Sequence, residues 1–252
     1  MDILDKYDND NKLTKLPKTN MTSAIDKRIF NDKNVSIDEI GLYAYLAFIS
    51  GRVGEYNGKR VVTNYKALDL YKRIYKPKGL SGSYRKTVDN IEKMLRHLEE
   101  LGYIKRFTSM GYPIIVISEI GDKQPFALIN AVNAKIITSG TSGRRTLRLL
   151  ATYAAIRSRV FEKRKGSKVD TGEKVFDMPL AYIAKCVNSD SRTINRYLQW
   201  LRTNYVLAYF KVVLPKVDKP LRCVYSDIYD HKTLKKTIEY RLRKGYVKRV
   251  VE

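Results

Sequence analysis

The sequence predicts an α+β fold, mainly α, made of two tandem copies of one helical unit that ends in a β-hairpin. Three observations lead to this prediction. Apolar residues recur at helical spacing in each half, apolar strands follow them, and the two halves repeat each other at an offset of 107 residues. At that offset segment 40–53 aligns with segment 147–160, and Ala44, Ala47, Ile49, Arg52 and Val53 match Ala151, Ala154, Ile156, Arg159 and Val160.

Each half begins with a helix, continues with a short strand, and then has two more helices. Thr63 and Asp177 follow the short strands and are expected to be N-caps of the second helices, because their side-chain oxygens accept hydrogen bonds from free helical N–H groups. We expect the first helix at 36–50 and 144–160, the short strand at 60–62 and 174–176, and the third helix at 83–101 and 191–203.

Two strands with a turn between them complete each half. We expect them at 103–107 and 112–117 in the first half, and at 205–214 and 221–225 in the second. Helix, strand, helix, helix and hairpin is the order of a winged helix-turn-helix, so the sequence predicts two such domains in tandem with β-hairpin wings. The expected divisions are a flexible N-terminal arm at 1–20, a first domain at 21–121, a second at 126–230 and a basic C-terminal helix at 231–252, with a short linker at 121–125.

The composition indicates a globular protein with a polyanionic partner. Of 252 residues, 44% are hydrophobic, which is enough for a packed core. Lys and Arg number 49 against 26 Asp and Glu, a net charge of +23, of which +6 lies in residues 1–125 and +17 in residues 126–252. Such an excess repels itself unless a polyanion shares the surface. Nucleic acid is the first candidate and an anionic membrane the second, although no apolar run approaches the ~20 residues that span a bilayer.

The third helix of the second half shows the clearest binding pattern. Ile194, Leu198 and Leu201 recur at helical spacing and define its buried face. The other faces carry Arg192, Asn195, Arg196 and Gln199, whose side chains hydrogen-bond to base edges or phosphates. With Ser189 or Ser191 as its expected cap, this helix is predicted to enter a major groove by its N-terminal end. The alternative is an amphipathic helix with a solvated polar face.

The candidate DNA-binding residues come from both third helices and both hairpins. From the third helices they are Ser83, Arg85, Lys86, Asn90 and Lys93, and Ser189, Ser191, Arg192, Thr193, Asn195, Arg196 and Gln199. From the hairpins they are Lys105, Arg106, Lys216, Lys219 and Arg222, although basic residues there also protect sheet edges. The basic connection 71–79 is a candidate phosphate-contacting loop. The C-terminal helix could bind phosphate, a partner subunit or a membrane, but packing onto the second domain is favoured.

Segment 29–46, IFNDKNVSIDEIGLYAYL, resembles the N-terminal winged helix of replication initiators and replisome organisers of Gram-positive plasmids and phages, including DnaD-like ones. The resemblance covers about 90 residues and includes LEELGYI at 98–104, which many winged helices share. The two-domain plan is similar to plasmid initiators with tandem winged helices. The resemblance implies binding to origin repeats and recruitment of replication proteins. The chain differs from DnaD-like proteins in having no acidic, helical C-terminal domain.

The sequence contains no recognisable catalytic, metal-binding or cofactor-binding motif, so we expect no catalytic residues, no metal and no cofactor. There is no P-loop, the two histidines, His97 and His231, lie far apart, and Cys186 and Cys223 lack zinc-site spacing. Few cysteines and a polar N-terminus are typical of a bacterial cytoplasmic protein.

We therefore expect a non-enzymatic, sequence-specific double-stranded DNA-binding protein of a mobile element. A replication initiator is preferred, with a homodimer and host replication proteins as further candidate partners and no membrane partner. The alternatives are a transcription regulator bound to promoter operators, a metal-dependent nuclease or recombinase, and a protein-interaction adaptor.

Overall fold

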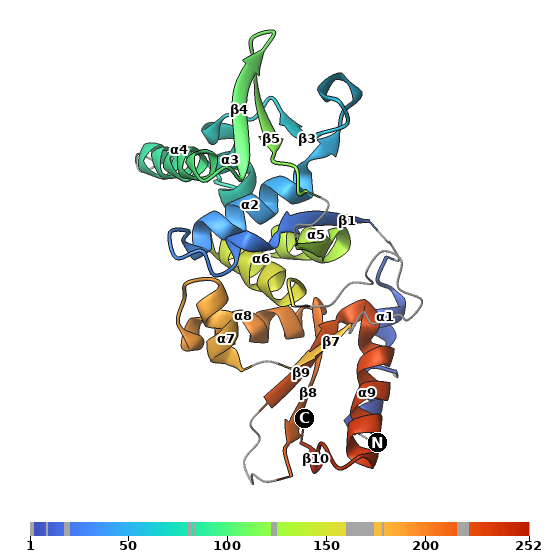
Figure 1. Cartoon of the computed structure of the whole chain (residues 1–252). Coiled ribbons are helices and arrows are strands. Elements are labelled where there is room, and N and C mark those ends of the chain that lie inside the picture. The colour runs from blue at the N-terminus through green and yellow to red at the C-terminus, as the bar shows by residue number, and fades with distance from the viewer. Residues whose placement is uncertain are drawn as a thin grey trace.

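The computed structural model describes residues 3–8, 10–17, 21–79, 82, 84–121, 125–159, 174–177, 179–215 and 222–251 (Figure 1). It is a mixed α/β structure with about 51% helix and 21% strand, so the expected α+β class with predominant helix is confirmed. Figure 1 shows the hairpin of the first half at one end of the molecule and that of the second half at the other, with the first helix of each half between them.

The first half forms around a long buried helix and a four-stranded antiparallel sheet in the order β2-β3-β5-β4. Ser36 and Glu39 form a reciprocal capping box at the start of the buried helix α2. The elements are β1 (Thr22–Asp26), α2 (Ile37–Ile49), β2 (Gly51–Arg52), β3 (Arg60–Thr63), α3 (Ala67–Tyr75), α4 (Tyr84–Glu100), β4 (Ile104–Ser109) and β5 (Tyr112–Ile117), with short 3₁₀ turns at Lys27–Ile29 and Gly54–Tyr56.

The second half repeats this order and ends in additional elements. Its antiparallel sheet has the order β10-β8-β9-β7, in which β7, β9 and β8 correspond to β3, β5 and β4. The elements are β6 (Phe126–Asn130), α5 (Ala131–Gly140), α6 (Arg144–Arg157), β7 (Val175–Asp177), α7 (Leu180–Cys186), α8 (Ser191–Thr203), β8 (Leu207–Val213), β9 (Arg222–Asp227), a 3₁₀ turn at Ile228–Asp230, α9 (His231–Arg243) and β10 (Arg249–Val250).

The strands that open the two halves pair with each other. β1 and β6 form an antiparallel two-stranded sheet with Ala24 opposite Leu128 at its centre. A shift of 104 residues, which carries Thr22 to Phe126 and Asp26 to Asn130, carries the pair Thr22–Asn130 onto the pair Phe126–Asp26. Like any antiparallel pair, these strands are related by a local two-fold symmetry, and their pairing joins the two halves.

The two central helices also pack directly against each other. Gly41 of α2 lies so close to α6 that a Cβ atom there would overlap the backbone carbonyl of Leu147. Arg148 of α6 donates a hydrogen bond of 2.7 Å to Asp38 at the start of α2. One continuous hydrophobic core includes buried residues of both halves. Strand pairing and helix packing between distant parts of the chain thus join the two halves into one packed body.

Tyr43 and Tyr153 make the same kind of buried hydrogen bond at this junction, each with the last residue of one of the paired strands. The hydroxyl oxygen of Tyr43 accepts a hydrogen bond from the Asp26 N–H, and that of Tyr153 accepts one from the Asn130 N–H. Asp26 and Asn130 in turn cap the next helical turn with their side chains. Burial raises the pKa of Tyr43 to about 12, and burial, followed by the charge of Asp227, raises the pKa of Tyr153 well above 10.

These tyrosines predict a loss of stability in alkali. Because their pKa values in the folded state exceed the unfolded value of about 10, the stabilisation is complete below pH 10 and is lost as pH rises through 12. Each such tyrosine contributes a slope of about 1.4 kcal/mol per pH unit. Urea denaturation at pH 8 to 11.5 should show this fall, and Tyr43→Phe should reduce its slope. An equal slope in both proteins would exclude Tyr43 as a cause.

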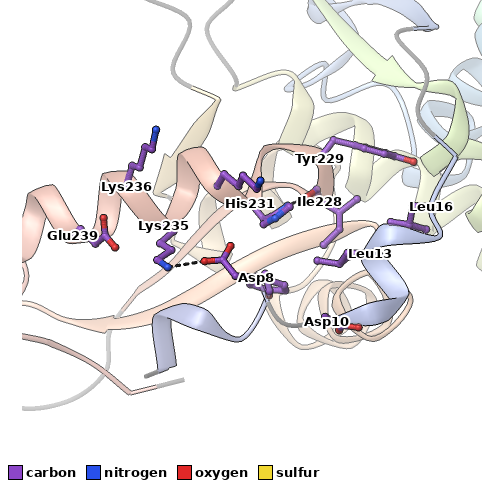
Figure 2. Close-up of a pocket in the computed structure, with 12 residues that line it drawn as sticks. Asp8, Asp10, Leu13, Leu16, Ile228, Tyr229, His231, Lys235, Lys236 and Glu239 are labelled. Atoms are coloured by element: carbon purple, nitrogen blue, oxygen red, sulfur yellow. Dashed lines mark hydrogen bonds and ion pairs between the residues drawn. The ribbon is translucent and has the colours of Figure 1, made fainter. Parts of the chain in front are cut away.

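The N-terminal arm lies against the second half instead of extending freely as expected. Tyr7 accepts a hydrogen bond from the Tyr209 N–H at 2.9 Å, on the edge of β8, and Lys235 of α9 lies 2.6 Å from both Asp5 and Asp8. The arm and α9 share an apolar cluster that covers the outer face of the second sheet, so α9 packs onto the second half as favoured. Figure 2 shows the groove of about 730 Å³ that remains between the arm and α9.

Candidate nucleic-acid interface

The turn between α7 and α8 is fixed by two hydrogen-bonded side chains. Asp190 caps α8 by accepting a hydrogen bond of 2.8 Å from the Thr193 N–H, so the expected cap at Ser189 or Ser191 was wrong by one residue. Asn188 has a left-handed backbone with a φ of 49° and donates from Nδ2 to the carbonyls of Asp32 and Val35, each at 2.7 Å. The turn between α7 and α8 is therefore attached to the first half.

Helix α8 has the two faces that its sequence predicts. Ile194, Leu198 and Leu201 are buried. Ser191, Arg192, Arg196 and Gln199 are exposed, and Ser189, Thr193 and Asn195 are half-buried. No acidic residue occurs in α8, whose sequence is SRTINRYLQWLRT. Its exposed surface therefore combines guanidinium groups with neutral hydrogen-bonding side chains, which suits contact with phosphates and base edges.

Helix α4 presents a more mixed surface. Ile91, Leu95 and Leu98 are buried, while Arg85, Lys86 and Lys93 are exposed and Asn90 is half-buried. Ser83 lies outside the described residues. Asp89, Glu92, Glu99 and Glu100 share this helix with the cations, so its net attraction for a polyanion is weaker than that of α8.

Arg106 is not available for the wing contact that was expected of it. It donates hydrogen bonds to Glu99 at 2.8 Å and to Glu92 at 2.7 Å, and its side chain is 24% exposed. The side chain faces α4 because Arg106 lies on the inner face of the hairpin, opposite Ile115. Arg106 thus fixes β4 to α4, whereas Lys105, its neighbour on the outer face, is exposed.

The start of β9, next to the turn of the second hairpin, is also held by ion pairs. Arg222 lies 3.6 Å from Asp177, and Asp177 accepts a hydrogen bond from Arg241 of α9 at 3.1 Å. Arg222 retains a side-chain exposure of 42%, so it can still contact a ligand. Lys216 and Lys219 lie outside the described residues.

Lys76, in the basic connection 71–79, contacts protein although it remains exposed. Its Nζ donates to the carbonyl of Thr138, and to those of Ser139 at 3.3 Å and Thr141 at 2.9 Å, near the end of α5. A cation is favoured at the carboxyl end of a helix. Lys76, after α3, and Asn188, after α7, therefore have similar roles, since each joins the end of a helix to the other half.

A cleft of about 360 Å³ lies beside α4, at the starts of α2 and α6. It brings Asn90 and Lys93 together with Arg144, a residue that the sequence analysis did not select. Arg144 and Arg145 stand in the first turn of α6, where the helix dipole disfavours cations. Asp38, at 3.7 Å from Arg144, partly offsets this charge, and the Arg144 side chain is 62% exposed. The sequence signal for this site is a pair of arginines at the start of a helix with no acidic residue next to them in the chain.

The cluster around Asp227 resembles a polar site but is closed. Asp227 accepts hydrogen bonds from Tyr153 at 2.7 Å and from Asn133 at 2.9 Å, and Asp227 is 2% exposed. Burial raises the pKa of Asp227, while the nearby Arg157 opposes this rise. The hydrogen bonds of this cluster join β6, α5, α6 and β9. Because these groups are buried from solvent, we interpret the cluster as structural.

Comparison with protein-family models, with curated proteins and with solved structures gives no match. Among the residues that the structure describes, no His, Cys, Asp and Glu side chains gather into a group that could hold a metal ion. Within the same part of the chain, no helix has the length and apolar character needed to cross a bilayer.

Proposed function

We propose that this chain is a double-stranded DNA-binding protein with two winged helix-turn-helix units, in which α4 and α8 are the recognition helices. The proposal is supported by the repeated order of a buried helix, a strand, two helices and a hairpin in each half, with the halves joined through β1 and β6. Proteins with two such units bind paired half-sites on a duplex.

The charge distribution supports duplex DNA as the ligand. The net charge is +23, and α8 exposes Arg192 and Arg196 with no acidic residue on the helix. Exposed cations of this kind bind phosphates with a strong salt dependence, whereas Asn195 and Gln199 add groups that can read base edges.

Within this class we propose a replication initiator of a plasmid or phage, on the basis of the resemblance of segment 29–46. A transcription regulator would use the same interface. The genomic position of the bound sequences distinguishes the two, because repeats beside an origin indicate initiation and a promoter operator indicates regulation.

Selection from a random duplex pool with the intact chain tests the proposal. It should recover duplexes with two conserved blocks, and log K should fall with log salt by ~0.9 for each phosphate contacted. Supercoiled DNA incubated with the protein and Mg²⁺ should keep its topology. A preference for single strands, no enrichment, or nicking of the plasmid would contradict the proposal.

A further inference from the structure

The tip of the first hairpin is apolar and fully accessible. Met110 is 95% exposed, the highest value among the large hydrophobic residues that the structure describes. Tyr112, after the turn, is 57% exposed, and Phe107, whose ring lies 6.0 Å from that of Tyr56, is 43% exposed. Contiguous apolar side chains on the surface of a highly charged protein mark a contact site.

The backbone of this turn is unfavourable for methionine. Met110 has a φ of 49° and Gly111 a φ of 80°, between the paired residues Ser109 and Tyr112. Two successive positive φ values are the requirement of a type I′ hairpin turn, for which Asn-Gly is the favoured pair. A methionine in this position adopts a conformation that costs energy, and an exposed side chain recovers none of that cost by burial. Folding thus provides no reason for methionine at position 110.

The hairpin holds Met110 at a fixed place relative to α4. Arg106 ties β4 to Glu92 and Glu99 of α4, as described above. β4 has six residues, which extend about 20 Å at ~3.4 Å per residue. Figure 1 shows the β4–β5 hairpin projecting away from the body of the molecule. The length of the hairpin is close to half of the ~34 Å helical repeat of DNA. Half a repeat is the distance that separates a major groove from the next minor groove.

We propose that Met110 is a wedge that enters the minor groove next to the α4 half-site and separates two stacked base pairs. Methionine is one of the apolar residues that DNA-bending proteins insert between base steps, which kinks the duplex by about 20–90°. Lys105 is exposed on the outer face of β4, the face that also carries Phe107. It is placed to contact the flanking phosphates. The patch consists of three side chains, which is small for a specific protein interface of ~800 Å² per partner. This inference rests on the proposed DNA-binding function.

The test uses the full chain and a duplex recovered by the random-pool selection. 2-Aminopurine replaces one adenine at a time, since its fluorescence rises when the base loses its stacking, and dyes at the duplex ends report bending by energy transfer. The variants are Met110→Asn, which favours the turn but removes the wedge, and Met110→Leu, which keeps an apolar side chain. Met21→Asn is the matched control, because Met21 is 72% exposed outside the hairpins.

The wild type, Met110→Leu and Met21→Asn should each raise the fluorescence at one position and bend the duplex. Met110→Asn should bind the same duplex but lose both signals, and it should unfold at a higher temperature than the wild type. Equal fluorescence and bending for Met110→Asn and the wild type would overturn the wedge and leave DNA binding intact. Failure to recover any duplex would remove the proposed function, and the wedge with it.

Discussion

Replacing Gly41 by alanine is expected to destabilise the protein more than the same replacement at any other glycine that the structure describes. The new Cβ would lie 2.7 Å from the Leu147 Cα and would overlap the Leu147 carbonyl. Alanine is the better helix former by about 1 kcal/mol. Overpacking usually costs about 1–3 kcal/mol, and here the obstacle is backbone, which cannot rotate away. We expect a net loss of at least ~2 kcal/mol in urea denaturation.

Gly51→Ala is the matched control, because no atom lies within 4 Å of the Cβ that it would add. It should change the free energy of unfolding by less than about 0.5 kcal/mol. If Gly41→Ala were as stable as Gly51→Ala, α2 and α6 could not pack as closely as described.

The shared core also predicts that fragments 21–121 and 126–252 fail to fold alone, since each would expose its half of the junction.

The double substitution Arg192→Ala and Arg196→Ala should produce the largest loss of specific DNA binding. Each arginine that contacts a base or phosphate contributes about 1–3 kcal/mol, so the pair should cost about 2–6 kcal/mol on the selected duplex. Both side chains are exposed on α8, where Arg196 donates a hydrogen bond of 3.2 Å to Thr193 in the same helix. Folding should therefore be unaffected, and fluorescence anisotropy titrations would measure the change in Kd.

Lys236→Ala with Arg243→Ala removes the same charge from exposed positions of α9. α9 covers the outer face of the second sheet, away from α8. This control should weaken binding to selected and random duplexes alike and should keep their ratio. A similar loss of the ratio in both double variants would show that net charge, and not the surface of α8, governs recognition.

The helices with clear local periodicity were predictable, whereas α5 (Ala131–Gly140) was not expected. Ile194, Leu198 and Leu201 define α8 from spacing alone, and the repeat at offset 107 indicated that the first half has the same order. The junction was not predictable, because β1 and β6 are short strands that pair across about 100 residues. A polar arm and a linker were the natural interpretation of segments whose partners lie elsewhere in the chain.

The candidate site shows the same limit for individual side chains. Arg192 and Arg196 were placed correctly on the surface because the opposite face of their helix is apolar. Arg106 was predicted to contact DNA, yet Glu92 and Glu99 bind it, and that pairing requires the packing of β4 on α4. The exposure of Met110 and its left-handed backbone likewise became evident only from the hairpin geometry.

The central claim is that α4 and α8 together contact two half-sites on one duplex. Hydroxyl-radical footprinting of the intact chain on the selected duplex tests it most directly. We predict two protected segments about 10 base pairs apart, with protection of one segment lost when ~5 base pairs are inserted between them, because the rigid junction cannot follow the rotation. A single protected segment that is unchanged by the insertion would contradict the claim.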